Sequence, residues 1–248
     1  MPDRNNRTID EKEVALFDAW ANNWWQTDSE TRWLHRYNPL RVDYVRRAVC
    51  RYFDRDPAPP DCLQGLRILD VGCGAGMLCE PLAALGATML GIDPAPSSIA
   101  IATAHARQTG VKVYYRCTTA RTLLDSGERF DVVLASEVIE HVGDSELFLR
   151  ECAALVAARG LLILSTINRT CKSFAYAIVI GEYVLRTLPV GTHQWAKFRT
   201  PDEIRVGLAA AGLSLTDVSG VTFNLMSGKM QLARDINVNY IVTAERIA

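Results

Sequence analysis

A short apolar run that leads into three closely spaced glycines limits the fold of this chain more than any other feature. The run Arg67–Val71 continues directly into Gly72-Cys-Gly74-Ala-Gly76. Glycine has no Cβ, so the backbone can bend sharply there and approach a ligand closely. In α/β proteins, a strand followed by such a loop and then a helix opens a nucleotide-type binding site. The segment therefore predicts a ligand-binding strand of an α/β sheet.

The spacing of the glycines favours one kind of ligand. A dinucleotide-binding loop reads Gly-x-Gly-x-x-Gly and would need its third glycine at Met77, whereas this chain has Gly-x-Gly-x-Gly after an acid. The carboxylate of Asp70 would repel a pyrophosphate, but it can reach the methionine end of S-adenosylmethionine (SAM) directly or through water. We therefore expect SAM rather than NAD, bound by Asp70, Gly72 and Gly74.

A second acid follows the next predicted strand. Asp93 stands at the end of Thr88–Ile92, where α/β nucleotide sites place the acid that binds ribose hydroxyls. The alternative interpretation is that the glycines only form a tight turn and that Asp93 caps the helix that begins near Pro94. Because the loop and the acid end two successive strands, a cofactor site is the stronger interpretation.

Short apolar runs alternate with helix-length segments from Leu66 onward. This alternation is typical of βαβ units, which build a mostly parallel sheet with helices on both faces. The last two runs are expected to close the sheet as an antiparallel edge. The predicted strands are Arg67–Val71, Thr88–Ile92, Val111–Tyr115, Asp131–Ala135, Leu161–Ser165, Leu213–Val221 and Val238–Ala244.

The first sixty residues are expected to form a helical lid. Asp10 and Glu13 have the spacing of a helix capping box, and large apolar residues from Phe17 to Trp24 recur on one face. The proline-rich stretch Asp56–Asp61 then interrupts helix, because proline fixes φ and lacks a donor. We predict a lid over residues 1–60 and an α/β domain over residues 61–248, built as one structural unit.

Composition excludes some classes of function. The chain has 248 residues and a net charge of −1, so it has no basic field with which to hold a nucleic acid. Its seven cysteines form no CxxC pair and are odd in number, which favours a reducing compartment. The stretch Met1–Glu13 resembles neither a signal peptide nor a transit peptide.

Two carboxylates and a histidine follow the fourth predicted strand. On a helix, Glu137, Glu140 and His141 would share one face, at the sheet edge where open α/β sheets bind ligands. Such ligands suit a hard cation such as Mg²⁺, and Zn²⁺ accepts the same residue types. A metal there would chelate two adjacent phenolic oxygens and lower the pKa of the attacking hydroxyl.

Two other interpretations of this cluster stay open. His141 or a nearby carboxylate can act as a general base without a metal. Alternatively, the segment is a solvated helix start whose acids favour the helix dipole, with an incidental histidine. His141 and Glu140 are the candidate catalytic residues.

The most apolar stretch outside the predicted sheet is Phe174–Leu188, which contains Glu182 and Arg186. It is shorter than the roughly 20 apolar residues that cross a bilayer. It can lie in a membrane interface, line a channel for a hydrophobic substrate, or form an ordinary helix that covers the sheet.

Several motifs together resemble the ubiquinone biosynthesis O-methyltransferase family. They are DVGCGAG, GIDP, ASEVIEHV, STINRT and GTHQWAKF, preceded by WW and LHRYNPLR, and they span roughly residues 10 to 245. Ser136 stands where bacterial members typically carry methionine, so the resemblance is closer to the mitochondrial branch. It implies a class I SAM-dependent methyltransferase with a Rossmann-like α/β fold and a seven-stranded sheet.

The resemblance also implies roles for individual residues. The family's SAM positions match Arg41, Gly72, Asp93 and Ser136, and its Mg²⁺ positions match Glu137, Glu140 and His141. Arg41 would pair with the carboxylate of the cofactor. The family methylates a polyprenyl-dihydroxybenzoate and demethylubiquinol, whose vicinal oxygens and isoprenoid tails agree with the acidic cluster and the apolar stretch.

The resemblance extends to location and partners. It implies peripheral membrane contact through Phe174–Leu188 at the matrix face of the mitochondrial inner membrane, with other ubiquinone-biosynthesis proteins as partners. Because no targeting segment is visible, bacterial cytoplasm beside a membrane is the alternative. Two competing functions stay open: a SAM methyltransferase of another small phenol or acid, and a non-catalytic SAM-binding subunit.

Overall fold

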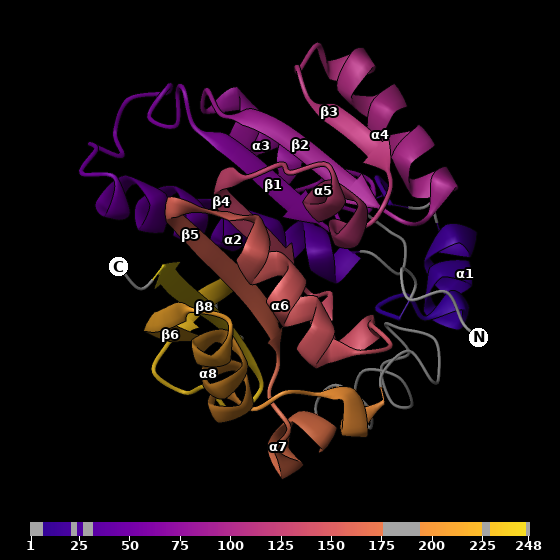
Figure 1. Cartoon of the computed structure of the whole chain (residues 1–248), viewed down its shortest axis with the longest axis vertical. Coiled ribbons are helices and arrows are strands. Elements are labelled where there is room, and N and C mark those ends of the chain that lie inside the picture. Colours follow the sequence, from indigo (N-terminus) through magenta and orange to yellow (C-terminus); the bar gives the residue numbers. More distant parts are fainter. Residues whose placement is uncertain (1–6, 21–23, 27–31, 176–193, 225–228, 247–248) are drawn as a thin grey trace.

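A computed structural model describes residues 7–20, 24–26, 32–175, 194–224 and 229–246 (Figure 1). These residues form one eight-stranded sheet with the strand order β3-β2-β1-β4-β5-β8-β6-β7. The strands are β1 (Arg67–Val71), β2 (Thr88–Asp93), β3 (Tyr114–Cys117), β4 (Phe130–Ser136), β5 (Val156–Ile167), β6 (Leu213–Asn224), β7 (Lys229–Ala233) and β8 (Asn239–Arg246).

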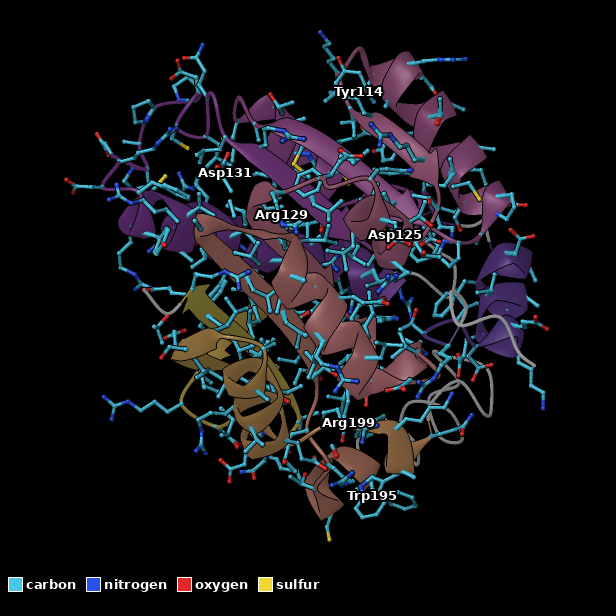
Figure 2. All side chains as sticks on the ribbon, viewed as in Figure 1. Tyr114, Asp125, Arg129, Asp131, Trp195 and Arg199 are labelled. Atoms are coloured by element: carbon cyan, nitrogen blue, oxygen red, sulfur yellow. The ribbon has the colours of Figure 1, made fainter. Side chains whose placement is uncertain are left out.

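The helices of the described residues connect and cover these strands. They are α1 (Glu11–Trp20), α2 (Arg32–Tyr52), α3 (Cys79–Ala84), α4 (Pro96–Thr109), α5 (Ala120–Asp125), α6 (Ser145–Leu155), α7 (Cys171–Ser173) and α8 (Pro201–Ala210), with the 3₁₀ helices η3 (Ile139–His141) and η5 (Trp195–Lys197). Trp195 of η5 donates from Nε1 to the carbonyl of Thr170, and its side chain lies beside α7 (Figure 2).

The first five strands run parallel, and β8 pairs antiparallel with both β5 and β6. Parallel strands are buried on both faces, so their side chains alternate between two cores. Leu69 of β1 belongs to the core under α5, α6 and α8, whereas its neighbour Ile68 belongs to the core under α2 and α3. The predicted α/β sandwich with helices on both faces is confirmed.

The sheet differs from the sequence prediction in two places. It has one strand more than the seven that the resemblance implies, because β7 pairs with the end of β6. The run Lys229–Ala233 contains Gln231 and is largely exposed, so it lacks the apolar alternation of a strand. The third strand begins at Tyr114 rather than at Val111. The other six predicted strands lie where the sequence placed them, with ends that differ by at most five residues.

The N-terminal helices occupy different positions. On α2, Tyr37, Val45 and Val49 are buried in the same core as strands β1, β4 and β5. In contrast, α1 lies at the side of the molecule beside the start of α4 (Figure 1), where Asp18 accepts a hydrogen bond from the backbone N–H of Ser97 at 3.0 Å. The division into a lid and a separate domain stays a prediction.

The predicted capping box of α1 forms only in part. Asp10 accepts a hydrogen bond from the backbone N–H of Lys12 at 3.1 Å, as an N-cap residue does. The carboxylate of Glu13 instead binds His141 and Lys197, so it does not close the box.

The expected membrane-contact stretch, Phe174–Leu188, lies outside the described residues from position 176 onward. Among the described helices, none has the length and apolar character needed to cross a membrane.

Candidate active site

One pocket gathers all residues that the sequence put forward for cofactor, metal or catalytic roles. It lies at the carboxyl ends of β1, β2 and β4, the edge where open α/β sheets bind ligands. Its empty volume is about 1290 Å³, which includes the open mouth. The candidates that line it are Arg41, Asp70, Gly72, Gly74, Asp93, Ser136, Glu137, Glu140 and His141.

The glycine loop forms the wall of the pocket after β1. Gly72 and Gly74 have φ angles of 72° and 52°, in the left-handed region that favours glycine. A Cβ on Gly72 would lie 2.6 Å from Cγ2 of Val138, and one on Gly74 would lie 3.0 Å from Cη2 of Trp24. Both positions therefore require glycine for space as well as for conformation.

Asp93 ties the end of β2 to the glycine loop. One carboxylate oxygen accepts the backbone N–H of Gly74 at 3.0 Å, and the other accepts that of Ala95 at 2.8 Å. Each oxygen retains a second lone pair for a ligand hydroxyl. Asp93 is not the N-cap residue of α4, because that position is Ala95. In the first turn of α4, the backbone N–H of Ser97 donates to the carboxylate of Asp18.

Asp70 is buried at the end of β1. It is 3% exposed, and its Oδ2 accepts a hydrogen bond from Sγ of Cys79 at 3.2 Å. Burial raises the pKa of Asp70 to about 6, although the Cys79 hydrogen bond and the charge of Arg41 act in the opposite direction. A positively charged ligand group would stabilise the ionised form of this carboxylate.

Arg41 enters the pocket from α2 and is buried. Its two terminal nitrogens donate to Oγ of Ser136 at 3.1 Å and to Oδ1 of Asn38 at 2.8 Å. Both partners are neutral, and Nε has no hydrogen-bond partner among the described residues. Burial lowers the pKa of Arg41. A buried guanidinium held by neutral groups suits an anionic group of a ligand.

Asn38 is a site residue that the sequence interpretation missed. Besides holding Arg41, it donates from Nδ2 to the carbonyl of Met77 at 2.7 Å and so joins α2 to the segment after the glycine loop. Its position three residues before Arg41, in the motif LHRYNPLR, was the available signal. Residues three apart on a helix lie on the same face.

Of the two glutamates after β4, Glu140 is buried and Glu137 is half-buried. Glu137 accepts hydrogen bonds from Oγ of Ser165 at 2.7 Å and from Nδ2 of Asn239 at 3.3 Å. Glu140 accepts one from Oγ1 of Thr166 at 2.8 Å. Burial, followed by the charge of Glu140, raises the pKa of Glu137 to about 7. The pKa of Glu140 is also raised, mainly by burial.

The predicted helical face does not form. The 3₁₀ helix begins only at Ile139, and Glu137 precedes it with a φ of 56°, a strained value for a residue with a side chain. Buried carboxylates with raised pKa values suit a hard cation in their chemistry. In the part of the chain that the structure describes, however, no three His, Cys, Asp or Glu side chains meet as metal ligands. The metal site stays a prediction.

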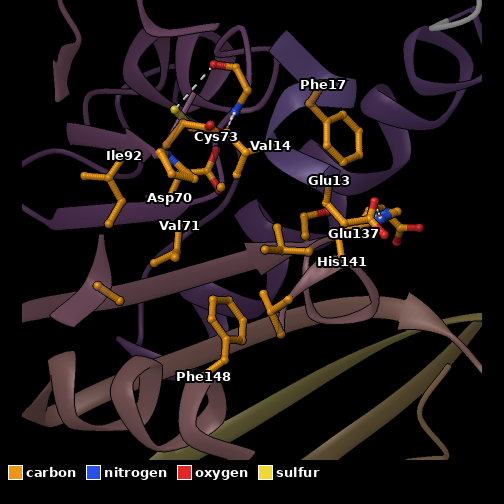
Figure 3. A pocket seen from close by; sticks show the side chains of 18 of the residues that line it. Glu13, Val14, Phe17, Asp70, Val71, Cys73, Ile92, Glu137, His141 and Phe148 are labelled. Atoms are coloured by element: carbon orange, nitrogen blue, oxygen red, sulfur yellow. Dashed lines mark hydrogen bonds and ion pairs between the residues drawn. The ribbon is translucent and has the colours of Figure 1, made fainter. Parts of the chain in front are cut away.

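His141 contacts a carboxylate from a distant part of the chain. Its Nδ1 lies 3.1 Å from Oε2 of Glu13 on α1, and the ring of Phe17 meets the imidazole edge-on at 4.9 Å between centroids. Nζ of Lys197 donates to Oε1 of Glu13 at 3.0 Å and to Asp10 at 2.9 Å. Figure 3 shows Glu13, Phe17, Glu137 and His141 gathered at one end of the pocket and Asp70 and Cys73 at the other.

Comparisons with known proteins identify the family. Residues 40–218 match the family model described as "Methyltransferase domain". The "Ubiquinone biosynthesis O-methyltransferase" of Methylobacterium nodulans is 49% identical, with 99% of each chain covered. The protein of the same name from Rhizobium etli is 47% identical, with 100% of each chain covered. The chain belongs to the ubiquinone biosynthesis O-methyltransferase family.

A solved structure supports the same fold at a greater distance. Magnesium protoporphyrin IX methyltransferase from Synechocystis PCC 6803, crystallised with bound SAM, shares 21% identity over 97% of this chain and 99% of its own, with a TM-score of 0.64. At that identity it is evidence for the fold alone. The family and the fold establish a SAM-dependent O-methyltransferase.

The relatives also bear on the branch of the family. Those from Methylobacterium, Rhizobium and Bradyrhizobium are bacterial proteins. They therefore give no support to the mitochondrial branch that Ser136 suggested. In the structure, Ser136 hydrogen-bonds Arg41 and Oγ of Ser165, so its hydroxyl has a local task in this family member whatever the branch.

Proposed function

We propose that this O-methyltransferase acts on the catechol-type hydroxyl of a polyprenyl-dihydroxybenzoate and of demethylubiquinol. The observation that carries the proposal is the division of one pocket into two ends. The end at β1 and β2 has acids and a guanidinium suited to SAM, and the end at β4 has buried carboxylates and a histidine suited to a phenol. The names of the full-length relatives support ubiquinone precursors as the substrates.

The cofactor end contains complementary groups for each part of SAM. Asp93 accepts hydrogen bonds from the two ribose hydroxyls with the lone pairs that Gly74 and Ala95 leave. Arg41 pairs with the carboxylate of the methionine moiety, and Asp70 with its ammonium group. The glycine loop brings backbone close to the ligand.

At the other end, His141 serves as the general base. Burial alone lowers the pKa of His141, but the hydrogen bond to Glu13 and the charges of Glu140 and Glu137 outweigh it, so the pKa is raised. The imidazole takes the proton of the phenol, and the charge of Glu140 stabilises the resulting imidazolium. The phenol oxygen bonds to the methyl carbon while the S–CH₃ bond breaks. The electron pair of the broken bond stays on the sulfur of S-adenosylhomocysteine, which is the leaving group.

Mg²⁺, or Zn²⁺ in its place, is a separate expectation for Glu137, Glu140 and His141. Such an ion would lower the pKa of the bound phenol by its positive charge. Because these side chains are engaged by Ser165, Thr166, Asn239 and Glu13 and do not meet as ligands, no step of the reaction above passes through a metal.

The function is tested by incubating the protein with SAM and short-chain prenylated catechols and measuring methylated product by mass spectrometry. We expect turnover that EDTA leaves unchanged if His141 acts alone. Loss of turnover in EDTA that added Mg²⁺ or Zn²⁺ restores would establish the metal instead. Methylation of simple phenolic acids in place of prenylated catechols would point to another substrate, and SAM binding without product to a non-catalytic subunit.

A matched variant separates chemistry from cofactor binding. Glu140→Gln should lose most turnover and retain S-adenosylhomocysteine affinity, because the carboxylate lies at the end of the pocket away from Asp93. Equal loss of affinity and turnover would contradict the assignment of Glu140 to the acceptor end. Circular dichroism and thermal denaturation check that the variant is folded.

For its location we favour bacterial cytoplasm beside a membrane, because the relatives are bacterial. Membrane contact through Phe174–Leu188, and association with other ubiquinone-biosynthesis proteins, are part of the same proposal. Liposome co-sedimentation tests the contact by comparing the wild type with a variant in which Ile178, Ile180 and Val184 are serine. Equal sedimentation of the folded variant would remove this stretch from the proposal.

A further inference from the structure

The carboxylate that contacts His141 comes from the N-terminal helix rather than from the sheet. Glu13 lies on α1, 128 residues before His141, and the two side chains are 11% and 13% exposed. Its Oε2 is 3.1 Å from Nδ1 of the imidazole. A long-range contact between two nearly buried polar groups, at the acceptor end of the pocket, requires α1 to be seated in one position.

Lys197 binds the other oxygen of the same carboxylate. Its Nζ lies 3.0 Å from Oε1 of Glu13 and 2.9 Å from Oδ2 of Asp10, so the ammonium bridges two acids one turn apart on the chain. Burial alone raises the pKa of Glu13, but the hydrogen bonds and charges of His141 and Lys197 outweigh it, and the pKa lies below its ordinary value. The carboxylate of Glu13 thus has an imidazole at one oxygen and an ammonium at the other.

Three further contacts seat α1 over the pocket. The carbonyl of Thr8 accepts the backbone N–H of Gly143 at 3.1 Å, just beyond His141. A Cβ on Gly143 would lie 2.8 Å from the carbonyl of Arg7, so the two segments approach as closely as glycine allows. Asp18 at the far end of the helix accepts from Ser97 on α4. Both ends of α1 are thus fixed to the body, with Glu13 between them.

The contact has a chemical consequence for the imidazole. A carboxylate accepts from Nδ1–H, so the neutral ring carries its proton on Nδ1 and its lone pair on Nε2. A histidine needs that tautomer whether it accepts a proton or binds a cation through Nε2. Carboxylates that orient metal-binding histidines in this way typically affect metal affinity or activity by about 10- to 100-fold, and we expect the same scale for a histidine that acts as a base.

We propose that Glu13 is a positioning residue that α1 supplies to His141, and that Lys197 holds Glu13 in place for this task. The inference rests on the proposed role of His141 as the reacting base. In its seated position α1 completes the acceptor end of the pocket, because the helix that lines the pocket also carries the carboxylate that fixes the histidine. The competing interpretation is that Glu13 and Lys197 only fasten α1 to the body.

The test compares Glu13→Gln with Glu11→Gln as a matched control. Both remove one negative charge from the first turns of α1, but Glu11 is exposed. We expect Glu13→Gln to lower kcat by about 10- to 100-fold and to leave the KM for SAM within about twofold. Glu11→Gln should change neither. A raised KM with unchanged kcat in Glu13→Gln would show a fastening role and overturn the proposal.

A spectroscopic readout keeps the proposal independent of turnover. In ¹⁵N-labelled protein bound to S-adenosylhomocysteine, the nitrogen shifts of His141 report which ring nitrogen carries the proton. We expect the Nδ1–H tautomer in the wild type and in Glu11→Gln, and a mixture in Glu13→Gln. The same tautomer in all three folded proteins would overturn the proposal even if no methylation of any phenol were found, whereas a failed methylation assay alone would count only against the proposed function.

Lys197 is tested through a double variant. If Lys197 acts only by holding Glu13, then Lys197→Met lowers kcat less than Glu13→Gln does, and the double variant is no worse than Glu13→Gln alone. Independent, multiplying effects on kcat would show that Lys197 has a task of its own and would contradict this part of the proposal.

Discussion

The two ends of the pocket are built by different kinds of hydrogen bond. At the cofactor end, backbone N–H groups hold Asp93 on both oxygens, and the N–H groups of Gly72 and Cys73 bond the carbonyl of Ile92 at 2.8 and 3.0 Å. At the acceptor end, the carboxylates of Glu137 and Glu140 accept from side chains on β5 and β8. Backbone donors are fixed by the course of the chain, whereas side-chain donors can change rotamer when a ligand arrives.

The cofactor end is therefore the more complete of the two before ligands bind. At the cofactor end, Asp93 is held by backbone groups that do not move with a side-chain rotamer. At the acceptor end, the pKa values of both Glu137 and Glu140 are raised, so a positively charged group of a substrate or an ion would stabilise their ionised forms.

The largest effect is expected at Asp93, where one residue serves both the ligand and the loop. Asp93→Ala removes the acceptor for the ribose hydroxyls and leaves two backbone N–H groups unpaired. Hydrogen bonds to a charged group contribute about 1.5–3 kcal/mol each, so we expect affinity for S-adenosylhomocysteine to fall by about 100-fold or more. Isothermal titration calorimetry measures it, with Asp125→Ala on the exposed end of α5 as the control. A loss below about fivefold would mean that the loop does not depend on Asp93.

The next largest loss of affinity is expected at Arg41, and it should depend on which ligand is bound. Arg41→Met should weaken S-adenosylhomocysteine about 10- to 100-fold, because one charge-assisted pair is lost. It should leave 5′-methylthioadenosine, which lacks the amino acid group, unchanged. Arg51→Met, on an exposed position of the same helix, is the control. If both ligands weaken equally in Arg41→Met, the guanidinium shapes the pocket without binding the carboxylate.

The same contrast explains what the sequence could predict. The cofactor end is local: strand, glycine loop and the acid after the next strand follow one another within Arg67–Asp93, so their spacing alone indicates the site. The acceptor end is not local. The helix expected through Glu137 does not form, because Glu137 has a φ of 56° and its N–H continues the pairing with β5 by bonding the carbonyl of Ser165 at 3.0 Å. No local pattern contains that partner.

Glu13 shows most clearly what local sequence patterns could not predict. Its spacing from Asp10 predicted a capping box, and that interpretation uses only neighbours in the chain. The structure uses the carboxylate for His141 and Lys197, which lie 128 and 184 residues away. Tertiary contacts of this length overrode the local preference, and the strongest remaining signal for Lys197 was its place in the motif GTHQWAKF.

Asp70 belongs to the cofactor end, but it resembles the acids of the acceptor end because burial raises its pKa. Its pKa in the folded protein is about 6, above the 3.8 of an ordinary aspartate. For an acid with a raised folded pKa, stability is fully present below the unfolded pKa and is lost as the pH rises through the folded value. The ligand-free wild type should therefore lose stability between about pH 4 and pH 6 through this group.

Asp70→Asn should remove that loss. At pH 7.5 we expect the variant without ligand to gain about 1–2 kcal/mol, because one pKa unit corresponds to about 1.4 kcal/mol and the amide still has a burial cost. Its affinity for S-adenosylhomocysteine should fall, since the ammonium group loses its partner. Chemical denaturation at pH 4 and pH 7.5 measures the first effect. A variant less stable than the wild type at both pH values would show that the carboxylate is a structural group.

The smallest effect is expected outside the pocket, where Trp25 fastens the segment that covers the glycine loop. Its ring stacks on His105 with 3.5 Å between centroids and an interplanar angle of 4°, and Nδ1 of His105 lies 2.7 Å from Glu80. The neighbouring Trp24 meets Gly74. An aromatic pair contributes about 0.5–1.5 kcal/mol beyond its burial, so Trp25→Leu should weaken S-adenosylhomocysteine about three- to tenfold and leave kcat unchanged.

Tyr114→Leu is the control for that variant, because this aromatic side chain is 54% exposed on β3, away from the pocket (Figure 2). If Trp25→Leu binds as tightly as the control, Trp24 holds its place on the glycine loop without help from the stack. If kcat falls as well, the N-terminal segment transmits its seating to the acceptor end, and the two ends of the pocket are less independent than their hydrogen bonds indicate.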